Sequence, residues 1–198
     1  MADLAISYSP SGKLAAFIRV LGPAGRQTLN EGAALQLWAD IRDHLKNEAS
    51  RRHGTAQKLG AYPTGHLEKA AASTDPHADA DAASVTIASP GISRAFRPLN
   101  IAPKRAQSLT IPVHWLGYGQ RASEVSAVYR LFRPKGKDYL MADVEGTPTV
   151  IYLLRKAVTM PQDRTLLPSD EALNKSAKRG YRDAIRLALE AASGGGAA

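Results

Sequence analysis

The chain has 198 residues, of which 44% are hydrophobic and 22% are charged, and its formal net charge is +8. This length suits one domain that buries about 70% of its unfolded surface, and the absence of cysteine excludes a disulfide framework, a thiolate zinc site and thiol catalysis. The first residues lack a secretory signal, and the apolar run at 14–21 is interrupted by Arg19 and falls short of a membrane span of about 20 residues, so we expect a soluble chain without a membrane partner.

The positive charge favours acidic partners, of which nucleic acid is the commonest. The lysines and arginines are spread along the whole chain, a distribution more typical of a solvated surface than of sequence-specific base reading. Contact with DNA through its phosphates stays open, because it needs no base-reading side chains.

The first predicted element is an amphipathic helix with Asn30 as its N-cap and Glu31 near the positive end of the helix dipole. Apolar residues then recur at three- and four-residue spacing, at Ala34, Leu37, Trp38, Ile41 and Leu45. Thr64 can cap a second, shorter helix that runs through Ala72. The small and acidic residues 73–82 predict a mobile loop.

Short β-like runs follow, and the first three are bounded by Pro, Gly or Ser. Strands are predicted at residues 84–88, 99–101, 109–114, 127–132, 139–142 and 149–154. Pro112 makes the third run an edge strand or marks a strand end, because proline donates no ladder hydrogen bond. Residues 133–138 predict a turn with a basic tip, and Glu145 and Gly146 mark another turn. The run 149–154 is the most apolar and predicts the central strand of an antiparallel sheet, covered on both faces.

The last predicted element is a helix with Ser169 as N-cap and Asp170 and Glu171 in its first turn. Its apolar stripe consists of Leu173, Ala177, Tyr181, Ala184, Ile185 and Ala188. Residues 193–198 predict a flexible Gly/Ala tail. The predicted fold class is α+β: a single domain over 1–192 in which an N-terminal and a C-terminal amphipathic helix pack on a small antiparallel sheet.

The residue types that carry catalysis or bind metals do not occur at the required spacing. No pair of the five histidines has the i, i+4 spacing with an intervening Glu of zinc hydrolases. A calcium loop that starts at Asp75 would need Gly and Glu where Ala80 and Thr86 stand. The Gly117-Tyr118-Gly119 segment lacks the third glycine of a dinucleotide site. We therefore expect no catalytic residue, no metal and no cofactor.

Several short motifs follow one another in a recognisable order: Arg52–Ala56, Thr64–Leu67, a strand with Val85 and Ile87, Gly117–Gly119 with Ser123 and Glu124, and Arg164–Glu171 before the last helix. This order resembles the virion morphogenesis, or tail-completion, family of tailed phages, especially of Mu-like phages. The resemblance covers residues 30–190.

The resemblance implies a structural protein of the virion and not an enzyme. Members of such families form rings at the neck or upper tail, where the head joins the tail and DNA passes. The implied partners are further copies of the chain, in a ring expected to be hexameric, other phage neck and tail proteins, and passing DNA without sequence specificity. The implied location is the virion neck or upper tail, and the host cytoplasm during assembly.

Five residues are candidates for the interface between subunits. Arg164, Leu166 and Leu167 form an apolar and cationic clip before a capped helix, and an arginine can bridge to a carboxylate through two parallel hydrogen bonds. Tyr118 and Arg121 lie in a turn after the predicted edge strand, and both residue types are enriched at interface hot spots. Packing of these residues within one subunit is an equally open interpretation.

Lys135 and Lys137, at the basic turn, are candidates for contact with DNA or a partner, against the alternative of an ordinary solvated turn. The alternative function is a basic nucleic-acid-binding accessory protein, whose DNA affinity would fall steeply as salt rises. A small hydrolase or transferase is the third possibility, and no constellation of residues supports it.

Overall fold

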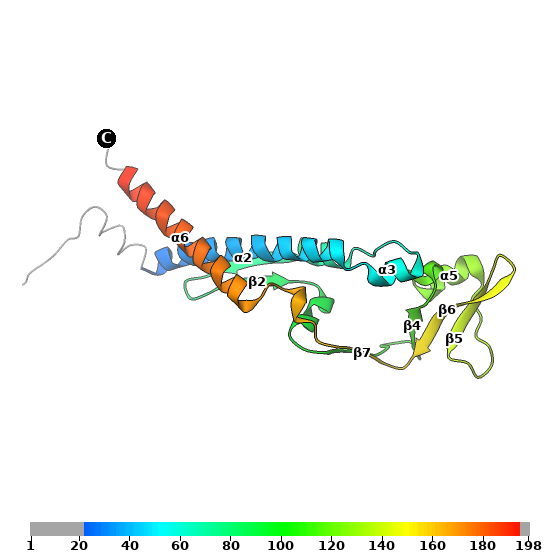
Figure 1. The fold of residues 1–198 in the computed structure, drawn as a ribbon. Helices are drawn as coiled ribbons and strands as arrows, with labels where there is room; N and C mark the ends of the chain where they lie inside the picture. Colours follow the sequence, from blue (N-terminus) through cyan, green and yellow to red (C-terminus); the bar gives the residue numbers. More distant parts are fainter. Residues whose placement is uncertain (1–21, 195–198) are drawn as a thin grey trace, which may run out of the picture. The chain divides into compact units, whose positions relative to one another are not determined.

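The computed structural model describes residues 22–194 and shows an α+β fold, which confirms the predicted class (Figure 1). The helices are α2 (Pro23–Arg51), α3 (Gly54–Leu59), α4 (His66–Ala72), α5 (Ala122–Tyr129) and α6 (Asp170–Gly194), with 3-10 turns η1 (Pro90–Ala95), η2 (Trp115–Gly117) and η3 (Arg164–Leu166). The strands are β1 (Thr74–Ala78), β2 (Ala83–Ile87), β3 (Leu99–Ile101), β4 (Leu109–Pro112), β5 (Tyr139–Val144), β6 (Thr147–Arg155) and β7 (Val158–Met160). They form three small antiparallel sheets, ordered β1-β2, β3-β7 and β4-β6-β5.

The contacts of the chain divide it into two compact units where the sequence predicts a single domain over 1–192. Among the described residues, the first unit consists of 22–44, 71–88 and 167–194, and the second of 45–70 and 89–166. Of the predicted tail at 193–198, Ser193 and Gly194 belong to α6, and the remainder lies outside the described residues. None of the helices between residues 22 and 194 is long and apolar enough to cross a membrane.

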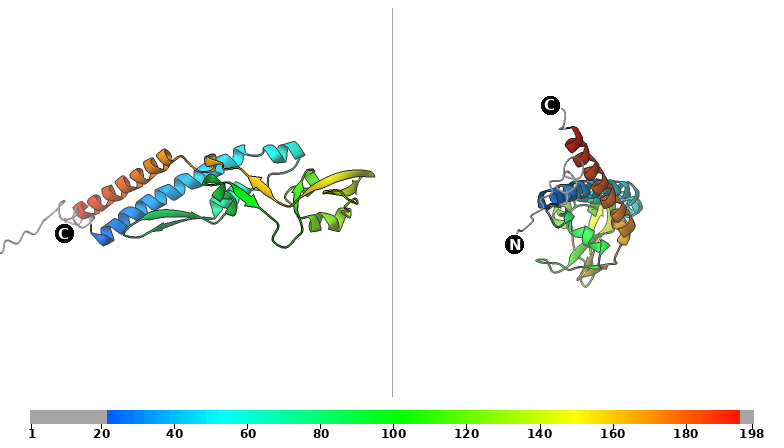
Figure 2. Two further views of the ribbon diagram at one scale, coloured as in Figure 1. Left: turned by 90° about the horizontal axis from the view of Figure 1, so that it is seen from below. Right: turned by 90° about the vertical axis from the view of Figure 1, so that its left-hand side faces the viewer.

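The first unit pairs residues 23–44 of α2 with the long helix α6, and the β1-β2 hairpin lies against α2 (Figure 2). The helices approach closely at two glycines: a Cβ added to Gly180 would lie 2.7 Å from the Cα of Ala33, and one added to Gly32 would lie 2.8 Å from the Cβ of Ala184. Arg179 on α6 donates two hydrogen bonds, of 2.8 and 2.7 Å, to the Asp40 carboxylate on α2. The small residues let the backbones approach, and the ion pair joins the helices at the edge of their contact.

Asn30 is not the N-cap that the sequence predicts, because α2 begins at Pro23, a residue favoured in the first helical turn. Asn30 is instead buried in the helix interior, with 7% of its surface exposed. Its Nδ2 donates to the carbonyl of Asp79 at 2.7 Å, and its Oδ1 accepts from the Tyr181 hydroxyl at 2.8 Å. One side chain thus joins α2 to the hairpin and to α6.

The predicted mobile loop at 73–82 is wrong, since β1 occupies Thr74–Ala78 and pairs with β2. At the turn, the Asp79 carboxylate accepts hydrogen bonds of 2.8 Å from the backbone amides of Asp81 and Ala82. These bonds lower the pKa of Asp79 and fix an Asx turn. The acidic residues therefore close a hairpin.

The second unit contains the three-stranded sheet, in which β6 is the central strand, as predicted. Ile151 and Tyr152 are consecutive in β6, so they point to opposite faces, and both are fully buried. They pack with Leu116, Val125 and Ala142. The prediction that Pro112 lies in an edge strand is also confirmed, because β4 pairs with β6 alone.

The predicted strand at 127–132 is wrong, since α5 occupies Ala122–Tyr129. The Glu124 carboxylate accepts a hydrogen bond of 2.8 Å from the backbone amide of Arg121, which satisfies a donor at the helix start. Val125 is buried against the sheet, and Arg130, with φ +31°, ends the helix. Capping and burial outweigh the β preference of Val128 and Tyr129.

Candidate partner-binding cavity

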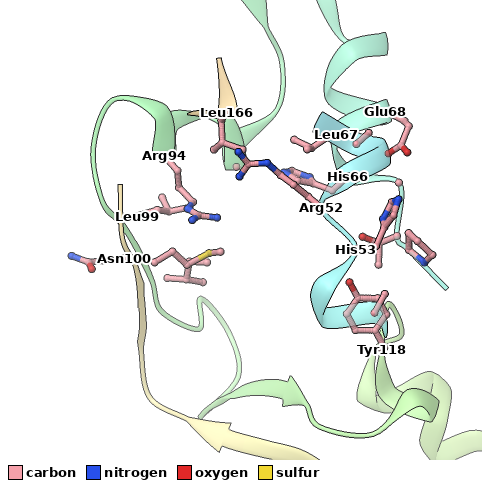
Figure 3. A pocket seen from close by; sticks show the side chains of 18 of the residues that line it. Arg52, His53, His66, Leu67, Glu68, Arg94, Leu99, Asn100, Tyr118 and Leu166 are labelled. Carbon is pink, nitrogen blue, oxygen red and sulfur yellow. The ribbon is translucent and has the colours of Figure 1, made fainter. Parts of the chain in front are cut away.

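The second unit holds a cavity of about 780 Å³, within the range of ligand-binding pockets (Figure 3). Its walls come from the end of α2, from α3 and α4, and from segments around η1, β3, η2, β7 and η3. The apolar part of the lining consists of Leu67, Leu99, Ile101, Met160 and Leu166. The polar part includes Arg52, His53, His66, Glu68, Arg94, Asn100, Lys104 and Tyr118.

Arg52 organises one wall of the cavity. Its guanidinium donates hydrogen bonds of 2.6 Å to the carboxylates of Glu48 and Asp163 and a further one to Thr165. Burial alone would lower the pKa of Arg52, and the bonds to the two carboxylates outweigh it and raise the pKa. Arg52 thereby ties α2 to the segment that leads into η3.

The carboxylate of Asp163 is the hydrogen-bond acceptor at the centre of this wall. It accepts from the Thr165 hydroxyl at 2.7 Å and from Arg52, and its carboxylate lies 3.9 Å from a guanidinium nitrogen of Arg94. The Thr165 bond, with the help of Arg52, holds the pKa of Asp163 below its ordinary value, although burial acts in the opposite direction. Arg94 also donates to the carbonyl of Pro161 at 3.2 Å. Both arginines are therefore held in place and brace the cavity.

The histidines of the cavity lie on α4 and before α3. His66 is the first residue of α4, and its ring packs on Gly91: a Cβ added to Gly91 would lie 2.6 Å from the His66 Nε2. His53 precedes the first residue of α3. Gly65 (φ +64°) directly precedes α4 and accepts a hydrogen bond from the amide of Lys69, so it takes the place that the sequence assigns to Thr64 as a cap.

Two of the five predicted interface residues line this cavity. Tyr118 follows η2 and is half-buried, whereas Leu166 ends η3 and has 5% of its surface exposed. The fold thus brings together two residues from separate motifs. Leu166 is buried in its own chain. For this residue, burial favours packing within the subunit over a role in the interface between subunits.

The other predicted residues lie elsewhere. Arg121 is exposed at the start of α5, and Arg164 is exposed in η3. Leu167 is half-buried and belongs to the first unit, so the predicted clip spans a boundary between units. Lys135 and Lys137 are exposed at the predicted turn, which is held by a 2.6 Å hydrogen bond from Arg133 Nε to the carbonyl of Lys137.

Most residues that line the cavity are not predicted by any pattern in the sequence. Arg52 and Asp163 are 111 residues apart, and nothing in their local sequence indicates that they pair. The sequence predicts Leu99 only as a strand residue and places Met160 in no element, and the two become neighbours because β3 pairs with β7. A prediction of this strand pairing would have placed both segments beside one another.

The lining combines an apolar wall with hydrogen-bond donors, which suits a peptide segment or side chain that has both characters. Among residues 22–194, no group of three or more His, Cys, Asp or Glu side chains is placed to hold a metal ion. The protein is thus an α+β chain of two units, and this cavity lies in the second. Comparisons with models of protein families, with curated proteins and with solved structures found no match.

Proposed function

We propose that the chain is a structural subunit of a tailed-phage virion, a neck or tail-completion subunit that forms a ring between head connector and tail. The proposal is supported by one observation above all: Tyr118, expected at a subunit interface, lies half-buried in the lining of a cavity that also includes the buried Leu166 of a second motif. In this proposal the cavity receives a segment of a neighbouring subunit, in the virion and in the host cytoplasm during assembly.

The composition of the cavity supports such a role. Interface hot spots are enriched in Tyr and Arg, and they lie in well-packed pockets with an apolar centre. Tyr118 provides a half-buried aromatic side chain, and Leu99 and Met160 provide apolar walls. Because Arg52 and Arg94 are fixed by Asp163, a partner would meet a preorganised wall, which lowers the entropic cost of binding.

The edge of the three-stranded sheet supplies a second surface for assembly. An edge strand offers unpaired backbone groups to another chain. In β4 the outer side is such an edge, and the residues that follow the strand include Val113 and Trp115, which are 37% and 52% exposed. A neighbouring subunit can pair with this edge and cover both apolar side chains.

The test compares Tyr118→Ala with Tyr62→Ala. Tyr62 is 93% exposed and lies outside the cavity lining, so it controls for the loss of a tyrosine. We expect Tyr118→Ala to stay folded and to reduce ring formation at least tenfold, measured by light scattering on a sizing column and by negative-stain imaging. The control should assemble like the unchanged protein. Equal assembly of both variants, or virions that form normally without the chain, would contradict the proposal.

A nucleic-acid-binding accessory protein is the second candidate, favoured by the exposed Lys135 and Lys137 and by the net charge of +8. It predicts a persistent monomer that binds duplex DNA at physiological salt, with an affinity that falls steeply as salt rises. Lys135→Ala together with Lys137→Ala should then weaken binding and lower the salt dependence by about 2 in log–log slope. Ring assembly without such binding would favour the first candidate.

A further inference from the structure

The first unit carries an apolar groove between α2 and α6, separate from the cavity of the second unit. Its volume is about 430 Å³, and small residues at the helix crossing form its floor, among them Gly32, Gly180 and Ala184. Leu35 on α2 and Leu187 on α6 border it, and they are 56% and 60% exposed. Two large, exposed apolar side chains therefore border the groove, and an occupant of the groove would bury both.

The charge of this groove differs from that of the chain as a whole. Glu31 and Asp183 are among the side chains that line it, and none of the described residues in the lining is a lysine or arginine. Each acid has a contact on its own helix, Glu31 with Gln27 at 3.1 Å and Asp183 with Arg186 at 3.3 Å, and both are exposed. In a chain of net charge +8, this surface suits an occupant that is apolar and basic.

The chain's own residues 13–21 have this composition. They read Lys-Leu-Ala-Ala-Phe-Ile-Arg-Val-Leu, so seven apolar residues are accompanied by Lys13 and Arg19 and by no acid. The segment ends immediately before Gly22 and Pro23, at the start of α2. Its composition complements the groove in both apolar character and charge.

The segment is also long enough to reach the groove. From Pro23 to Leu35 the helix rises about 18 Å, at 1.5 Å per residue. Eight extended residues span up to about 26 Å. A chain that reverses at Gly22 can therefore run back along α2 as far as Leu35. We propose that residues 13–21 dock in the groove of their own chain, with their apolar side chains against Leu35 and Leu187, and with Arg19 beside Glu31 or Asp183.

Cysteine cross-linking tests this docking, because the natural chain contains no cysteine. The full-length variant Ala16→Cys with Ala188→Cys carries one cysteine in the segment and one in the groove. The control, Ala16→Cys with Ala172→Cys, places the second cysteine on the exposed first turn of the same helix. We expect an intrachain disulfide to form at least tenfold faster in the first variant, as measured by gel mobility and peptide mapping. Equal rates would overturn the proposal, and so would a disulfide between two chains, which would assign the groove to a neighbouring copy.

Trypsin cleavage after Arg19 provides a second measurement without cysteines. Leu35→Asp should expose the segment and accelerate this cleavage at least fivefold in the full chain. The matched control is Val128→Asp, which changes an apolar side chain that is 75% exposed on α5, and it should leave the rate unchanged. A rate that Leu35→Asp does not alter would overturn the proposal.

Discussion

At the scale of single residues, Asn30 shows how one buried polar group organises the first unit. Its amide donates to the carbonyl of Asp79 and accepts from the hydroxyl of Tyr181, so both ends of the side chain are satisfied. A buried polar group without its partner costs about 1–3 kcal/mol. The removal of Asn30 would leave the Asp79 carbonyl and the Tyr181 hydroxyl without this partner.

We therefore predict that Asn30→Ala lowers the free energy of unfolding by about 1–3 kcal/mol. Asn47→Ala changes an exposed asparagine of the same helix and should have an effect within about 0.5 kcal/mol. Urea unfolding of both variants measures the difference. Equal stability of the two would show that the contacts of Asn30 are not what holds the hairpin and α6 to α2.

The second prediction at this scale concerns pH. Since the pKa of Asp163 is lowered in the folded chain, its contribution to stability is present above the unfolded pKa of about 3.9 and is lost as the pH falls through the folded value. Asp163→Asn should therefore be less stable than the unchanged chain at pH 7, and its stability should fall less between pH 5 and pH 2. Urea unfolding at several pH values measures this.

The control for this prediction is Asp143→Asn, which changes an exposed carboxylate on β5. Its stability should follow the unchanged chain across the acidic range. Parallel curves for Asp163→Asn and the unchanged chain would mean that the ion pair with Arg52 adds nothing to folding.

At the scale of elements, the crossing of α2 and α6 depends on the absence of side chains. Alanine normally stabilises a helix interior by about 1 kcal/mol over glycine. At Gly180, however, an added Cβ would lie 2.7 Å from the Cα of Ala33, which is backbone and cannot turn aside. For Gly180→Ala, steric contact between the two helices thus predicts a loss of stability, whereas helix propensity predicts a gain.

We predict that the steric contact outweighs the helix propensity, so that Gly180→Ala destabilises the chain by about 1–3 kcal/mol. Gly54→Ala is the control, because a Cβ at Gly54 meets nothing within 4 Å and should cause no loss. Thermal or urea unfolding checks both. A Gly180→Ala variant that gains stability would show that the helices do not approach as closely as described.

At the scale of the whole molecule, the division into two units has a measurable consequence. The two tryptophans of the chain report on one unit each, since Trp38 lies in the first and Trp115 in the second. Leu166 is buried in the second unit. A change at Leu166 should therefore act unequally on the two fluorescence signals, provided that the units unfold separately.

We predict that Leu166→Ala destabilises the second unit by about 2–5 kcal/mol, seen through Trp115 in a Trp38→Phe background. Through Trp38, in a Trp115→Phe background, the shift should be smaller. Arg164→Ala, an exposed change in the same turn, should affect neither signal. Equal shifts of both tryptophans on Leu166→Ala would mean that the chain unfolds as one cooperative body.

Local signals in the sequence were enough for the fold class and for several elements. The apolar run around Ile151 predicts the central strand, because a strand covered on both faces must be apolar on both. Ser169 predicts the start of the last helix, and its hydroxyl does accept a hydrogen bond of 3.2 Å from the amide of Ala172. Caps and apolar periodicity act over a few residues, so they can be read without a fold.

Tertiary structure decided the rest. It placed Asn30 in a helix interior, turned the acidic segment at 73–82 into a hairpin, and made a helix of residues whose β propensity predicts a strand. In the candidate cavity, Tyr118 and Leu166 were predicted individually, but their meeting there and the pairing of Arg52 with Asp163 depend on contacts between distant segments. Such contacts form only when burial brings those segments together, and no local pattern of residues records them.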